Sequence, residues 1–149
     1  MIRVLVPIEA FARLTLSAAY FALELAKRHP AKVYFLILGT AKVEAGAASG
    51  KLQEEELFEQ LLERARQQQV NVEVRYSQAE YITAIRQLVA QRGIDDIVIA
   101  LPPAGDPAHH PLQRRLEQLR HQVQCHIITV KPKDVGPLGL VPRPRKTQS

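Results

Sequence analysis

Short apolar runs alternate along the chain with longer segments whose apolar residues recur every three or four positions. The short runs are rich in β-branched residues and predict buried strands, whereas the longer periodicity predicts amphipathic helices. Strands are predicted at residues 3–9, 32–38, 70–76, 96–101 and 126–130, and helices at 12–28, 52–69, a segment ending at 92, and 112–122. This β-α-β-α-β-α-β-α-β order predicts an α/β fold: a five-stranded, mainly parallel sheet with helices on both faces.

Local signals set several of the element boundaries. Pro30 should end the first helix, and Gly93 should close the third. Ser77 and Glu80 have the spacing of a capping box before the third helix. Valines alternate with polar residues over 70–76, which predicts a strand with one wetter face at a sheet edge. The glycine- and alanine-rich segment 39–51 is expected to be a mobile connection.

The segment from Asp95 to Pro111 is the one most relevant to function. Its first half is the fourth predicted strand, ending near Leu101, and its second half holds four prolines and a glycine. We therefore expect a loop from Leu101 to Pro111 at the carboxyl end of that strand. In open α/β sheets, ligands bind outside the carboxyl ends of the strands.

Charge is distributed unevenly along the 149 residues. The net charge is +5, but residues 131–149 alone carry five basic side chains and one acidic side chain. The remaining chain is close to neutral and lacks a broad basic face, so nucleic-acid binding is not expected. We expect one domain over residues 1–131 and a basic, Pro- and Gly-rich disordered tail over 132–149.

Composition also indicates the cellular compartment in which the protein is expected. No apolar run approaches the ~20 residues of a membrane span, and no signal peptide is evident at the N-terminus. A single cysteine, Cys125, cannot form an internal disulfide and suits a reducing compartment. These features predict a cytoplasmic protein.

Several local strings, taken in order, resemble the universal stress protein family over roughly residues 2–130. The first strand ends in Val6-Pro7-Ile8-Glu9, similar to the family's Val-Pro-Val-Asp, and Ala22 to Arg28 is similar to a common first-helix sequence. Gly93 to Ala100 resembles the family's fourth strand, and Cys125 to Val130 its last. The resemblance implies a flavodoxin-like or Rossmann-like fold, a cytoplasmic role in stress survival, and a homodimer commonly built through the last strand, here His126 to Val130.

One branch of that family binds ATP through glycines after the fourth strand, whose amides approach the phosphates. This chain departs from the motif at each anchor. Ala100 and Pro103 stand where the first two glycines would be, and Gln113 and Arg114 where a later glycine and a serine or threonine would be. Glu9 replaces the usual nucleoside-contacting aspartate. The chain is therefore predicted to belong to the branch without nucleotide, and no cofactor is expected.

Four residues remain candidates for a degenerate ligand crevice: Glu9, Ala100, Arg114 and Arg115. Arg114 and Arg115, near the start of the fourth predicted helix, could hold an anion by charge or could simply be solvated. Glu9 should face the crevice, where it would contact a ligand, cap a helix or meet water.

Other candidate chemistry is weaker. His109 and His110 are adjacent loop residues with no partners at zinc-ligand spacing, so a metal site is not expected. Cys125 is interpreted as a core or interface residue. No nucleophile–base arrangement, paired carboxylates or nucleophile elbow is present, so catalysis is not expected.

The sequence therefore favours a non-catalytic stress protein that binds a protein partner or an unidentified small ligand. The alternative is a nucleotide-binding regulator that binds ATP through a non-standard phosphate loop at residues 101–115. A third hypothesis is an accessory domain that associates in trans with a transporter.

Overall fold

A computed structural model describes residues 1–9, 13–39 and 49–131. The strands are β1 (Ile2–Ile8), β2 (Ala31–Leu38), β3 (Asn71–Ser77), β4 (Asp96–Ala100) and β5 (His126–Val130). The helices are α1 (Arg13–Arg28), α2 (Ser49–Gln67), α3 (Tyr81–Arg92) and α4 (His109–Arg120). The predicted element order is confirmed. The predicted tail at 132–149 and most of the predicted mobile connection lie outside the described residues.

The five strands form one parallel sheet in the order β3-β2-β1-β4-β5. β1 is central, and the chain winds outward from it first through β2 and β3. It then returns to the other side of β1 for β4 and β5. The strand order therefore reverses between β1 and β4, and the carboxyl ends of these two strands flank the switch point where α/β folds bind ligands. β3 is an edge strand, as its alternating pattern predicted.

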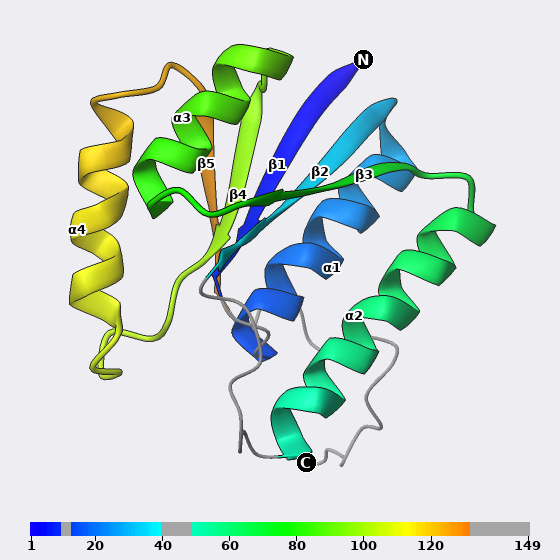
Figure 1. Ribbon diagram of the computed structural model, residues 1–149, viewed down its shortest axis with the longest axis horizontal. Helices are drawn as coiled ribbons and strands as arrows, with labels where there is room; N and C mark the ends of the chain where they lie inside the picture. Colours follow the sequence, from blue (N-terminus) through cyan, green and yellow to red (C-terminus); the bar gives the residue numbers. More distant parts are fainter. Residues whose placement is uncertain (10–12, 40–48, 132–149) are drawn as a thin grey trace.

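Helices cover both faces of the sheet, as expected, with α1 and α2 on one face and α3 and α4 on the other (Figure 1). Phe35 and Phe58 pack edge to face in the α1/α2 layer, with ring centroids 5.2 Å apart. In the α3/α4 layer, Leu5, Ile85 and Leu119 have essentially no exposed surface. Burial of apolar side chains in these two layers is the main stabilising contribution to the fold.

The ends of α3 show which local predictions hold. Gly93 follows the helix with φ of 65°, in the left-handed region, and its N–H bonds to the Val89 carbonyl, so the predicted C-terminal stop is confirmed. The predicted capping box is wrong. Glu80 is itself the N-cap, and its carboxylate accepts hydrogen bonds from the Ile82 and Thr83 amides. Ser77 instead accepts a hydrogen bond from the Ala79 amide.

Helix α4 begins at His109, three residues before its predicted start. Pro111 lies in the first turn, where its missing N–H would have had no intrahelical partner, so it does not prevent the helix from forming. His109 and His110 are therefore helical residues rather than loop residues. Arg114 and Arg115 lie in the second turn, away from the helix N-terminus.

Candidate ligand crevice

A cavity of about 210 Å³ lies at the carboxyl ends of β1 and β4, at the switch point of the sheet. It is lined by Pro7, Glu9, Leu14, Thr15, Ala18, Tyr81, Ile99, Ala100 and Leu112. Most of these side chains are apolar. Two of the sequence-predicted site residues, Glu9 and Ala100, are among them.

The most direct polar contact beside this cavity joins Glu9 to Arg115. Arg115 Nη1 donates to Glu9 Oε1 at 2.7 Å, and Nη2 donates to Oε2 at 2.6 Å. This parallel, two-bond geometry is the strongest form of a carboxylate–guanidinium pair. The hydrogen bond to Glu9 raises the pKa of the Arg115 guanidinium. The pair ties the residue after β1 to the middle of α4.

Tyr81 holds the other side of the Arg115 guanidinium. Arg115 Cζ lies 4.2 Å from the centre of the Tyr81 ring, a cation–π arrangement. Tyr81 is 5% exposed, and its burial raises the pKa of its phenol. Tyr81 is therefore neutral at physiological pH, and its ring fixes the orientation of the arginine.

Arg114 is not part of this arrangement. Its neighbour Arg115 reaches Glu9, whereas Arg114 lies exposed on α4. Adjacent helical residues point about 100° apart, so they do not face the same site. The predicted pairing of Arg114 and Arg115 around one anion is therefore not what the structure shows.

The loop between β4 and α4 uses three of its backbone amides in its own turns. The Asp106 amide donates to the Pro103 carbonyl, the His109 amide to the Asp106 carbonyl, and the Ala108 amide to Asp106 Oδ1. Pro103 has no amide hydrogen. Amides that are engaged in the loop's own turns are not presented to a phosphate, which a phosphate cradle requires.

The two histidines of this region have structural contacts. His109 Nδ1 lies 2.7 Å from the Pro102 carbonyl oxygen, and the rings of His109 and His110 meet edge to face. Within residues 1–9, 13–39 and 49–131, no cluster of three or more His, Cys, Asp or Glu is placed to hold a metal.

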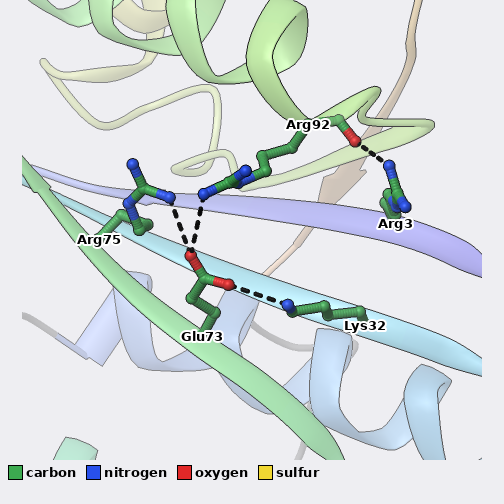
Figure 2. A network of polar contacts seen from close by, with 5 residues as sticks. All are labelled: Arg3, Lys32, Glu73, Arg75 and Arg92. Carbon is green, nitrogen blue, oxygen red and sulfur yellow. Dashed lines mark hydrogen bonds and ion pairs between the residues drawn. The ribbon is translucent and has the colours of Figure 1, made fainter.

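A second polar cluster lies over β2 and β3, centred on Glu73 (Figure 2). Lys32 Nζ lies 2.9 Å from Glu73 Oε1, and Arg75 Nη1 lies 2.9 Å from Oε2. Arg92 Nη2 lies 3.9 Å from Oε2, and the Arg92 carbonyl accepts a hydrogen bond from Arg3. The hydrogen bonds from Lys32 and Arg75 lower the pKa of Glu73, and the bond to Glu73 raises the pKa of Lys32. The cluster joins β2 and β3 to the end of α3.

Cys125 precedes β5 and donates a hydrogen bond from Sγ to the Ile94 carbonyl at 3.2 Å. Burial, with the nearby Asp95 and Asp96 carboxylates, raises the pKa of its thiol. A raised thiol pKa disfavours the nucleophilic thiolate. These contacts fit the structural role predicted for Cys125.

The fold is that of an open α/β protein with a cavity at its switch point, and comparison with known proteins defines it further. The model of the universal stress protein family matches residues 1–131, and the chain belongs to this family. No curated protein sequence matches the chain.

Solved structures share the fold at low identity. A universal stress protein in complex with cAMP is 15% identical with a TM-score of 0.63, and the match covers 88% of this chain and 97% of that one. UspA from Lactobacillus plantarum is 21% identical with a TM-score of 0.58, over 87% and 97% of the two chains. A family member from Arabidopsis thaliana with AMP bound is 16% identical with a TM-score of 0.57, over 88% and 92%.

Sequence analysis missed Tyr81 and overrated Arg114. A signal for Arg115 was present, because it is three residues from Leu112 and four from Leu119, on the same helix face as the apolar stripe. Arg114 is off that stripe. Tyr81 had no comparable signal, because its place beside Arg115 depends on how α3 and α4 pack together.

Proposed function

We propose that this chain is a non-catalytic stress-response protein of the cytoplasm that acts as a homodimer by binding a protein partner or a small ligand. The observation that carries the proposal is the Glu9–Arg115 pair beside the switch-point cavity. Because Glu9 and Arg115 are paired to each other, neither charged group beside the crevice is poised as a general acid or base, which supports a non-catalytic role.

The size and charge of the crevice support a role without ATP. A volume of about 210 Å³ is below the ~300–1,000 Å³ of pockets that bury drug-sized ligands. Arg115 is neutralised by Glu9, and the β4–α4 loop bonds to itself. At this position a triphosphate would therefore meet an arginine that is already paired, and a loop in which the Asp106, Ala108 and His109 amides are already bonded and Pro103 has none.

The two sheet edges support dimerisation through β5 rather than β3. β3 carries Glu73 and Arg75, and charged side chains on an edge strand oppose pairing with another strand. β5 carries Ile127 and Ile128, both half-buried, between His126 and Thr129. An edge strand with little charge is the better candidate for antiparallel pairing with a second copy.

Among the described residues, no helix is long and apolar enough to cross a membrane.

Three assays test this proposal together. Light scattering on the purified chain should give the mass of a dimer, and the protein should release no phosphate from ATP, GTP or AMP. Affinity capture from a cell lysate, with Thr129→Lys as the edge variant, then asks whether partner binding depends on the dimer. A monomer at micromolar concentration, or steady phosphate release, would contradict the proposal.

The second candidate function is a nucleotide-binding regulator. Two structural relatives, the cAMP complex and the AMP complex, favour it, since the family's fold accepts nucleotides in those proteins. In this chain a nucleotide would take the anion contact from Arg115, with Ala100 beneath it and Glu9 at the nucleoside end. It would first have to open the Glu9–Arg115 pair.

A further inference from the structure

The cavity beside β1 and β4 combines an apolar interior with one negative and one positive group. Leu14, Ile99 and Leu112 supply apolar lining. Glu9 and Arg115 supply a carboxylate and a guanidinium in direct contact. The side chain of Arg115 is 35% exposed and that of Glu9 is 41% exposed, so both can be reached from solvent.

The charge around this pair is unsuited to a polyanion. Glu80 also acts on Arg115 electrostatically, while its own carboxylate is engaged by the α3 amides. The phenol of Tyr81 is neutral. The described charged groups in direct contact here are therefore one carboxylate and one guanidinium, with the Glu80 carboxylate acting on Arg115 only from a distance, which favours a ligand that brings a positive group as well as a negative one.

We propose that the crevice binds a small zwitterion, namely a free α-amino acid with an aliphatic side chain. Its carboxylate replaces Glu9 on Arg115, its ammonium binds the released Glu9 carboxylate, and its side chain enters the cavity. The exchange keeps every charge paired, because one internal ion pair becomes two pairs with the ligand. This inference rests on the ligand-binding part of the proposed function.

The surroundings of Arg115 prepare it for this exchange. The Tyr81 ring holds the guanidinium from its face at 4.2 Å, which leaves the edge that now contacts Glu9 available to another carboxylate. Planar, two-bond recognition of a carboxylate is the geometry that arginine provides best. Glu9 follows the last residue of β1 and is not held within a strand.

The cavity volume limits the side chain. A volume of about 210 Å³ holds several water molecules and is ample for a branched aliphatic side chain. The apolar lining would favour such a side chain over a charged or strongly polar one, since a polar group buried there would lack hydrogen-bond partners. Leucine is therefore the probe of choice.

Isothermal titration calorimetry on the full chain tests the proposal with four probes: L-leucine, 4-methylpentanoate, 3-methylbutylamine and inorganic phosphate. The second probe lacks the ammonium, and the third lacks the carboxylate. Leucine should bind, and each truncated probe should bind about 10- to 100-fold more weakly, because each loses a charged hydrogen-bonded contact. Phosphate should bind more weakly than leucine.

Variants locate the site. Glu9→Gln and Arg115→Gln should each weaken leucine binding by about tenfold or more. Arg120→Gln, which removes an exposed ion pair with Glu117 on the same helix, should leave it unchanged. The wild-type probe series does not depend on the folding of any variant.

Three results would overturn the inference. The first is no heat with leucine up to about 10 mM, where a Kd near 1 mM would be detected. The others are equal binding of leucine and 4-methylpentanoate, and tighter binding of phosphate than of leucine. Failure of the dimer or partner assays would instead count against the proposed function, since neither the mass of the purified chain nor the capture of a protein partner measures amino-acid binding.

Discussion

Glu9 and Arg115 are 106 positions apart in the chain, yet their side chains meet in two parallel hydrogen bonds of 2.7 and 2.6 Å. The contact joins the end of the central strand to α4 beside the switch-point cavity. The same two residues thus link β1 to α4 and are charged groups beside the cavity.

The link itself should contribute little to stability. Both side chains are about a third or more exposed, and exposed ion pairs contribute roughly 0.2–1 kcal/mol. Glu9→Gln, Arg115→Gln and the double variant form a cycle whose coupling energy, from urea unfolding, should be below about 1 kcal/mol. A coupling of several kcal/mol would show that the pair holds the fold together and is not free to exchange with a ligand.

Glu73 should contribute more to stability than the Glu9–Arg115 pair, because its negative charge offsets three positively charged side chains. Glu73→Gln is expected to lower the free energy of unfolding by about 1 kcal/mol at neutral pH, since Lys32, Arg75 and Arg92 would then repel one another. Urea unfolding measures the change. Glu117→Gln is the matched control, because it removes an ion pair with Arg120 on the exposed face of α4, and it should have no measurable effect.

The difference between wild type and Glu73→Gln should depend on pH. The pKa of Glu73 is lowered in the folded state, so its contribution is present above the unfolded pKa and is lost as pH falls through the folded value. The pKa of Lys32 is raised, so its contribution is present below the unfolded value and is lost as pH rises through the folded one. The difference should therefore be constant near neutrality and shrink toward both extremes. A difference that persists in strong acid would contradict the assignment.

Substitution of Gly93 should destabilise the protein, because the backbone at this position adopts a left-handed conformation. At φ of 65°, an alanine is strained, whereas its Cβ would meet only Arg3 Nη1 at an ordinary 3.4 Å. Gly93→Ala should cost about 1–2 kcal/mol in urea unfolding with an unchanged m-value, and Gly93→Asn should cost less, because asparagine tolerates the left-handed region. Equal costs for the two variants would point to a packing effect instead.

The β5 edge gives a prediction about assembly. Thr129 is exposed on β5, and Thr129→Lys would place a like charge on each of two paired strands, so light scattering should show a shift from dimer to monomer. Tyr76→Lys makes the same kind of change on the opposite edge strand, where Tyr76 is 75% exposed, and should leave the mass unchanged. The reverse pattern would place the interface on β3.

Much of the fold was predictable because hydrophobic periodicity reports burial directly. The bounds of β5 are those predicted, and Gly93 ends α3 as expected. The errors occurred where a local rule had two outcomes. Pro111 was taken to exclude a helix but lies in its first turn, and Glu80 was taken as the partner of a cap but is the cap.

The candidate site was predictable in part. Glu9 and Ala100 line the cavity because strand ends in a parallel sheet converge on the switch point, which the element order implies. Lys32 meets Glu73 because β2 and β3 are neighbouring strands, and Arg75 lies two residues from Glu73 on β3. The contacts of Tyr81 with Arg115 and of Arg92 with Glu73 arise from how helices pack. No local pattern in the sequence carries that information.

The central claim is that the crevice is closed to nucleotides by its own ion pair, beside a loop that has Pro103 where a phosphate-binding glycine would be. The most direct test is calorimetric titration of the purified chain with ATP and Mg²⁺ and with AMP, after the protein has been denatured and its supernatant analysed for co-purified nucleotide. We predict an empty supernatant and no binding heat. Binding with a micromolar Kd, or nucleotide in the supernatant, would contradict the account and favour the nucleotide-binding regulator.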